Sequence, residues 1–420
     1  MIALKKEKVT PQALAKAANR LCACMVIYIA TLSLSLVPLG DLGSVQKYIG
    51  ILVSGLGIIF VLPVLPKIRI APITWIWFGF TAYIFLGMLW HPEPKKAFNV
   101  GFAMVLVFAV SALCACVSYE SKHFRWFENA LAFSGLVVVV LFFLFGEKVG
   151  GQRMSLVFPT ASANSNQLSC YMLIPALSLL WLVFSERPAW FRTICYLLTC
   201  ALAYGILLTG SRAGLLSLGI GVFFVFLCHA FKSAKNFIFV ILMGLVLLGV
   251  VVVCYLYLLP ESVSERLTIE SAVQSGGSYR VQIWSSGIEV FKQADWVKKI
   301  FGHGAESINI SKLVMHNQFL QILIDMGIFG LAVYVSMLVL MAVTFVKKSK
   351  MMLCVFIALQ VYSMFGSCYA YNKAFWLLWL FAAVCAVSHT PVEESSMPPF
   401  LRVRKDMKKQ KKAGLTDEAV

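Results

Sequence analysis

Long apolar stretches separated by short polar connections make up most of the chain. A helix that crosses a bilayer needs about 20 mostly apolar residues, and about twelve stretches approach that length. They are residues 21–40, 48–66, 71–90, 98–117, 131–146, 165–185, 193–211, 213–231, 237–259, 318–346, 351–370 and 373–388. Because lipid requires each spanning segment to satisfy its own backbone polar groups, the pattern predicts an all-α polytopic membrane protein.

One long polar segment, residues 260–317, separates the ninth and tenth stretches. Within it, Val281, Trp284, Ile288 and Phe291 recur at helical spacing, which predicts an amphipathic helix. The expected division is therefore a basic N-terminus at 1–20, spans at 21–259, the polar segment at 260–317, spans at 318–388 and a basic tail at 389–420.

Composition and charge support this interpretation and add an orientation. The sequence is 60% hydrophobic and 13% charged, which excludes a soluble domain. Most of the 36 Lys and Arg residues fall on the side of the membrane that holds Met1, so we expect both termini in the cytoplasm and residues 260–317 in the periplasm. Basic runs such as Lys408–Lys412 flank spans and are typical of contacts to anionic lipid, so the net charge of +17 does not indicate a nucleic-acid partner.

The cysteines give no sign of a disulfide framework or of a metal centre. All twelve lie within the predicted spans. The pairs Cys22/Cys24 and Cys114/Cys116 would point to nearly opposite faces of a helix, which is unsuitable for chelation. We therefore predict structural cysteines and no metal.

Polar residues gather at the outer ends of the predicted spans, and the middle of the spans holds no Asp, Glu, Lys, Arg or His. One gathering is the loop from residue 150 to 166, rich in small, hydroxylated and amide residues, which predicts a tight hydrogen-bonded loop. Another is Thr209–Gly214, a sharp reversal between two spans that contains Arg212. Arg212 is either an anchor that reaches the membrane surface or a guanidinium that binds phosphate bidentately.

A third gathering lies in the polar segment itself. Arg280 falls in the first turn of the predicted amphipathic helix, where free N–H groups favour an anion, although it could instead pair with Glu289. His316 precedes the tenth span and is either a polar helix start or a general base that titrates near neutral pH. His303 and His91 are rival bases that no predicted helix end positions.

Taken together, these segments resemble the O-antigen ligase and O-antigen polymerase superfamily. Four blocks carry the resemblance: Arg153 through Asn166; Gly210-Ser211-Arg212-Ala213-Gly214; Tyr279-Arg280 through Trp284 and on to Phe301-Gly302-His303-Gly304; and His316-Asn317-Gln318-Phe319-Leu320 with Asp325-Met326-Gly327-Ile328-Phe329-Gly330. The last block, within the twelve-span layout, is the specific one.

The resemblance implies a multi-spanning glycosyltransferase at the periplasmic face of the bacterial inner membrane, without a cofactor or metal. Its donor would be a glycan on undecaprenyl diphosphate. The acceptor would be a lipid A-core sugar in a ligase, which we prefer, or another lipid-linked repeat unit in a polymerase. A lipid-linked glycan transporter is a remote alternative, because transporter sites lie near the midplane of the bilayer.

The same resemblance implies roles for seven residues. Arg212 and Arg280 would bind the donor diphosphate with help from Arg153, and His316 would be the catalytic base. The supporting residues would be Ser211, Tyr279 and Asn317.

Overall fold

The computed structural model describes residues 9–40, 42–149, 153–159, 161–274, 279–305, 307, 314–366 and 373–388. Predictions that concern residues 1–8, the Gly150–Gln152 part of the small-residue loop, Ser275–Ser278 and the basic tail at 389–420 lie outside the described residues.

The elements follow one another in this order: α1 (Pro11–Ala30), η1 (Leu32–Leu36), α2 (Val45–Val61), η2 (Leu62–Lys67), α3 (Pro72–Leu86), η3 (Gly87–Leu89), α4 (Pro94–Cys114), α5 (Ser121–Phe145), β1 (Gly146–Val149), β2 (Arg153–Phe158), β3 (Ala161–Ser162), α6 (Ser165–Val183), α7 (Ala189–Leu208), α8 (Arg212–Ala230), α9 (Ala234–Val253), η4 (Cys254–Leu258), α10 (Glu261–Leu267), α11 (Ile269–Gln274), α12 (Arg280–Gln293), α13 (Trp296–Phe301), α14 (Gln318–Lys348), α15 (Lys350–Ser363) and α16 (Lys373–Val387).

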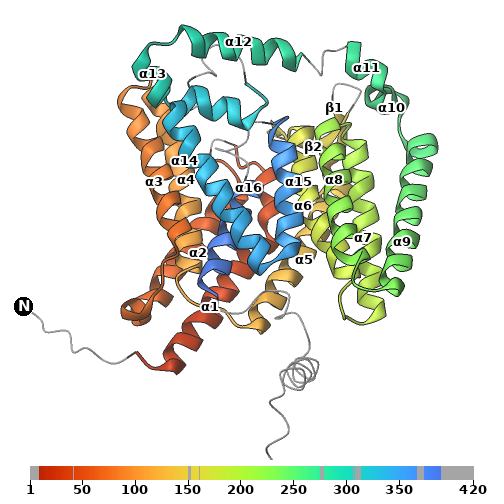
Figure 1. Ribbon diagram of the computed structural model, residues 1–420, viewed down its shortest axis with the longest axis horizontal. Helices are drawn as coiled ribbons and strands as arrows, with labels where there is room; N and C mark the ends of the chain where they lie inside the picture. Colours follow the sequence, from red (N-terminus) through yellow and green to blue (C-terminus); the bar gives the residue numbers. More distant parts are fainter. Residues whose placement is uncertain are drawn as a thin grey trace, which may run out of the picture.

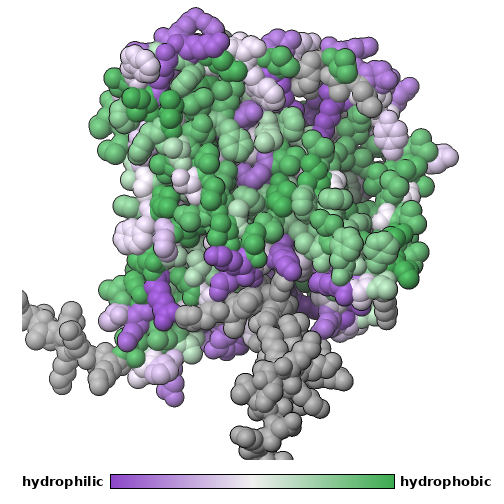
Figure 2. Space-filling model, viewed as in Figure 1, coloured by the Kyte–Doolittle hydropathy of each residue, from purple (hydrophilic) through white to green (hydrophobic). Residues whose placement is uncertain are grey.

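The predicted all-α membrane architecture is confirmed. Among the described residues, 10 helices are long and apolar enough to cross a bilayer, and two shorter apolar helices, Lys350–Ser363 and Ala374–Val387, stand beside them. Figure 2 shows the apolar belt that these helices create around the middle of the molecule, with hydrophilic residues at both ends. The exact number of spans remains a prediction.

One helix boundary differs clearly from the sequence-based expectation. The fifth apolar stretch looked short, but α5 runs over 25 residues because its first turns are polar and begin at a capping box between Glu120 and His123. The backbone N–H of Glu120 donates to His123 Nδ1 at 3.0 Å. Hydropathy alone does not detect this polar start, because the capping signal lies outside the apolar window.

A small antiparallel sheet stands before α6, where we predicted a tight hydrogen-bonded loop. Its strand order is β1-β2-β3, and in its first pair Gly146 lies opposite Leu156 and Val149 opposite Arg153. The segment has few residues of high β-propensity, which explains why the sequence did not reveal the strands. The sheet lies at one end of the helical bundle (Figure 1).

Helices α10 to α13 cross that same end of the bundle, which we call the capped end (Figure 1). The predicted helix at 281–291 is confirmed as α12, but its packed face differs from the predicted one. Ile283 and Phe291 pack against Met315 and Ile324, whereas Val281 is 59% exposed. The face is rotated because Gly287 provides the close approach: a Cβ there would lie 2.3 Å from Met315 Sδ.

The core lies between the central helices and around an aromatic group. Helix α6 is buried along almost its whole length. Farther along, Trp77 of α3 stacks on Trp376 of α16 at 5.8 Å between ring centroids and meets Trp379 edge-on at 4.6 Å. Such contacts fix the inner helices, so the ends of α6, α8, α14 and α15 keep defined positions at the capped end.

Candidate active site

Arg153 stands at the start of β2 and reaches into the junction of α6 and α8. Its Nε donates to the Thr209 carbonyl at 2.8 Å and its Nη2 donates to Asn166 Oδ1 at 2.7 Å. Asn166 is itself held by the Tyr362 hydroxyl, which donates to its carbonyl at 2.5 Å. The guanidinium is thus fixed by groups from the residues before α8 and from α6.

Arg212 lies within the predicted reversal and is the first residue of α8. Ser211 is the N-cap, and its hydroxyl accepts from the Gly214 N–H at 3.2 Å. Arg212 donates from Nε and Nη2 to the Arg266 carbonyl at 2.9 and 2.6 Å, and from Nη2 to Ser271 Oγ at 2.9 Å. The side chain therefore turns toward α10 and α11 of the cap.

Arg266 of α10 joins this group, although no motif in the sequence marks it. Its Nε donates to the Gly210 carbonyl at 3.3 Å. A Cβ at Gly210 would lie 3.4 Å from Arg266 Cδ and 3.7 Å from Arg153 Cγ, so both side chains converge on this glycine. In the sequence Arg266 follows Glu265, which is typical of a solvated charge pair. The chain brings Arg266 to Gly210 only when α10 folds back over α8.

Arg280 is the first residue of α12, as predicted. Tyr279 before it is the N-cap, with a left-handed backbone (φ 61°) and a side chain that is 69% exposed. The Arg280 guanidinium lies 5.7 Å from the centre of the Phe365 ring, just beyond α15. This cation–π contact directs Arg280 inward, toward the other arginines.

The electrostatics confirm that the arginines lie near one another. Burial first, and then the positive charge of Arg266, lower the pKa of Arg153 to about 10. Burial likewise lowers the pKa of Arg280, with further contributions from Arg266 and Arg212. Within the described residues, Arg153, Arg266 and Arg280 form no ion pair with a carboxylate. Because arginine stays protonated at neutral pH, this cluster carries an excess of positive charge.

His316 lies just before α14, within reach of this positive charge. Burial lowers the pKa of His316, and the charge of Arg280 lowers it further. Its backbone is left-handed (φ 49°), and the next residue, Asn317, is the N-cap whose Oδ1 accepts from the Leu320 N–H at 3.0 Å. The imidazole is therefore kept largely neutral near pH 7, the form that accepts a proton.

A buried polar network supports the segment that carries His316. Asp325, 0% exposed, accepts from Gln321 Nε2 at 2.9 Å and from Ser307 Oγ at 3.2 Å. Gln321 Oε1 in turn accepts from the Met315 N–H at 3.2 Å. The Met315 carbonyl accepts from Trp284 Nε1 at 2.8 Å, so the same residue is tied to α12.

The two rival histidines hold the loop after α13 and do not join the arginines. His303 contacts the Ile324 carbonyl through Nδ1 at 3.1 Å. His91 Nδ1 accepts from the Glu93 N–H at 2.7 Å, and the ring packs against Gly304, where a Cβ would lie 2.6 Å from His91 Cδ2. Their contacts explain both residues as structural.

The described residues contain no group of three or more His, Cys, Asp and Glu side chains that could hold a metal ion. The ends of β2, α8, α10 and α12 instead bring together guanidinium groups, beside one imidazole. Such an arrangement is suited to binding an anion with several oxygen atoms and to accepting a proton next to it.

Comparison with known proteins agrees with the motifs. Residues 197–335, from within α7 to the middle of α14, match the O-Antigen ligase family model, and this confirms the superfamily resemblance. The matched range contains Arg212, Arg266, Arg280 and His316, whereas Arg153 precedes it.

No curated protein matches the chain. One solved chain, from "Structural coordination of polymerization and crosslinking by a peptidoglycan synthase complex", is 16% identical, with a TM-score of 0.44 over 75% of this chain and 96% of that one. A likeness at this level carries no argument.

Proposed function

We propose that this chain is an O-antigen ligase of the bacterial inner membrane. It moves a glycan from undecaprenyl diphosphate to a sugar hydroxyl of lipid A-core at the periplasmic face. The observation that carries the proposal is the arginine cluster beside His316; Arg212, Arg266 and Arg280 of this cluster, and His316, lie in the part of the chain that matches the O-Antigen ligase family.

The arginines bind the donor's diphosphate in this proposal. Negative charge accumulates on the diphosphate as the bond to the anomeric carbon breaks, and fixed cations stabilise that transition state. Arg153, Arg212 and Arg280 hold the diphosphate, and Arg266 adds a fourth positive charge. Arg212 already donates two hydrogen bonds to the Arg266 carbonyl, and it exchanges this acceptor for phosphate oxygens when the donor binds.

His316 is the general base of the transfer. Its imidazole removes the proton of the acceptor hydroxyl while that oxygen attacks the anomeric carbon. The carbon–oxygen bond to the diphosphate breaks in the same step, and its electron pair leaves with the diphosphate, so the anomeric centre inverts. No metal is required, because the guanidinium groups supply the charge that a bound cation supplies elsewhere. Tyr279, Ser211 and Asn317 support the site as helix caps.

Transfer in vitro with purified lipid-linked glycan and two alternative acceptors tests the proposal. A ligase attaches the glycan to lipid A-core, whereas product formed only on a second lipid-linked repeat unit would establish a polymerase. Protein that moves the glycan across a vesicle membrane but transfers none would contradict both.

Substitution tests the residue roles. His316→Ala, Arg212→Ala and Arg280→Ala are each expected to lower the transfer rate at least about a hundredfold, the scale of losing a base or a charge-stabilising donor. Arg212→Lys should also have a low transfer rate, because the single ammonium of lysine cannot donate the two parallel hydrogen bonds of a guanidinium. The matched control is His303→Ala, which should keep a near-normal transfer rate. If His303→Ala lost transfer while His316→Ala kept it, His316 would not be the base.

A further inference from the structure

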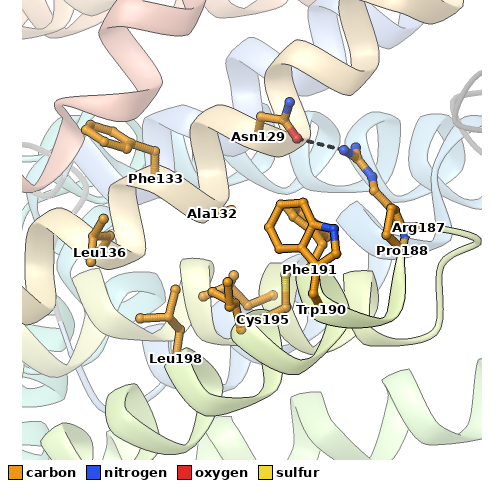
Figure 3. Close-up of a pocket in the computed structure, with 12 residues that line it drawn as sticks. Asn129, Ala132, Phe133, Leu136, Arg187, Pro188, Trp190, Phe191, Cys195 and Leu198 are labelled. Carbon is orange, nitrogen blue, oxygen red and sulfur yellow. Dashed lines mark hydrogen bonds between the residues drawn. The ribbon is translucent and has the colours of Figure 1, made fainter.

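A groove between α5 and α7 opens at the end of the bundle opposite the capped end. It has a volume of about 460 Å³, and Ala132, Leu136 and Leu198 are among the side chains that line it, with Cys195 on its inner side (Figure 3). This volume falls in the range of about 300–1,000 Å³ that is common for small-ligand sites. The groove is remote from the arginine cluster, because α7 carries its lining residues at the end away from Arg212.

The shape of the groove follows from the packing of α5. At Gly135, α5 lies so close to its neighbours that a Cβ would meet Pro175 Cβ at 3.0 Å and Leu202 Cδ1 at 3.3 Å. Ala132 and Leu136, on either side of this close contact, line the groove together with Leu179. We call this mostly apolar groove the slot.

The outer wall of the groove faces the surroundings of the protein. Phe133, Trp190 and Ile194 are 54%, 65% and 47% exposed, and all three line the groove. In a bilayer these residues contact hydrocarbon, so a lipid chain reaches the slot sideways without crossing water. Trp190 lies beside Pro188, at the start of α7, a position typical of the boundary between hydrocarbon and headgroups.

A fixed guanidinium stands at the mouth. Arg187 donates from Nη1 to Asn129 Oδ1 and from Nη2 to Glu128 Oε2, both at 2.9 Å (Figure 3 shows the first bond). The guanidinium also lies 5.0 Å from the centre of the Phe191 ring. Two of its N–H groups are engaged, and a guanidinium has further donors at its edge. Arg125 on the preceding turn of α5 is close enough to influence Glu128, so a second cation stands near the Arg187–Glu128 pair.

We propose that this groove binds one acyl chain of an anionic phospholipid, with the lipid phosphate at Arg187. The apolar slot matches the hydrocarbon chain, and the positive mouth matches an anionic headgroup. Basic pockets between spanning helices commonly bind such headgroups. The proposal does not depend on the transferase function, because no residue of the groove belongs to the arginine cluster.

Native mass spectrometry of the delipidated full-length protein tests this inference. Phosphatidylglycerol is expected to be retained about fivefold better than phosphatidylcholine with the same chains, the effect of one cation at a membrane surface. Ala132→Trp fills the slot and should lower phosphatidylglycerol retention at least about tenfold. The matched control is Val140→Trp, because Val140 is 45% exposed on the same helix and does not line the groove.

The charge contribution has its own variant. Arg187→Gln combined with Glu128→Gln removes both ions, so that no buried charge is left unpaired. This variant should still bind lipid, but its preference for phosphatidylglycerol over phosphatidylcholine should fall, because the guanidinium at the mouth is gone. Equal retention of both lipids by the original protein, unchanged retention by Ala132→Trp, or equally strong binding of glycerol phosphate without acyl chains would each overturn the proposal.

Discussion

At the scale of single residues, Arg280 connects the arginine cluster with His316, the proposed base. Its positive charge disfavours the imidazolium form of His316 and so lowers the pKa of that histidine, in addition to the effect of burial. A base must be neutral to act, so transfer is expected to fall as pH drops through the pKa of His316 if this residue is the base. The lowered pKa would then extend activity toward acidic pH.

Replacing Arg280 should move this limit. Arg280→Gln removes the charge, which raises the pKa of His316, so the acidic limb of the kcat/KM profile is expected to shift to higher pH. Arg280→Lys keeps the charge but loses the bidentate fork; its transfer rate should fall while its acidic limb stays in place. Profiles of kcat/KM measured from pH 5 to 8 distinguish the two variants. An unshifted acidic limb in Arg280→Gln would contradict the effect of the Arg280 charge on the pKa of His316.

The sequence predicted some residues of the cluster better than others. Arg153, Arg212 and Arg280 lie in recognisable motifs, and the structure brings all three together at the capped end. Arg266 carries no local signal, because its position depends on α10 folding back to Gly210. Local patterns report helix ends and turns, whereas contacts between distant segments depend on the tertiary fold.

At the scale of elements, the Gly302-His303-Gly304 and Asp325-Met326-Gly327 motifs form one packed joint. A Cβ at Gly302 would lie 2.3 Å from the Asp325 carbonyl oxygen, and a Cβ at Gly327 would lie 2.2 Å from the Ile300 carbonyl oxygen. Gly327 also breaks α14, with φ 68° and ψ −172°. Both motifs are visible in the sequence. Their contact is not, and it is possible only because Gly302 and Gly327 carry no side chain.

Gly327→Ala should therefore destabilise the protein. The left-handed backbone costs an alanine about 1–3 kcal/mol, and the clash with the Ile300 carbonyl adds to this. The expected result is a lower thermal midpoint in detergent, with a loss of transfer because Asp325 and the segment before α14 shift. Gly219→Ala is the control, since a Cβ there meets nothing within 4 Å in the middle of α8 and should be neutral or slightly stabilising. Equal thermal midpoints for Gly327→Ala and Gly219→Ala would contradict the close packing of the two motifs.

At the scale of the whole molecule, the apolar pattern predicted the helical bundle because lipid permits few alternatives. It did not predict the small sheet that places Arg153, since short strands in a polar segment lack the alternation that identifies them. The arrangement of the cap was also beyond the sequence, because α10 to α13 are short and their positions depend on contacts such as Trp284 to Met315. All four arginines nevertheless meet at one end of the bundle, so the orientation of that end decides where the chemistry takes place.

The orientation itself can be measured with single cysteine reporters. Trp296 in α13 at the capped end and Phe231 just after α8 at the other end are each 78% exposed, so Trp296→Cys and Phe231→Cys are matched in accessibility. The distribution of basic residues predicts that the capped end lies in the periplasm. A membrane-impermeant maleimide should therefore label Trp296→Cys in cells whose outer membrane alone is permeabilised, and Phe231→Cys only after the inner membrane is opened. The unsubstituted chain gives the background, and its described cysteines are all buried or partly buried. The reverse labelling order would place the arginine cluster in the cytoplasm, where a periplasmic lipid-linked donor could not reach it.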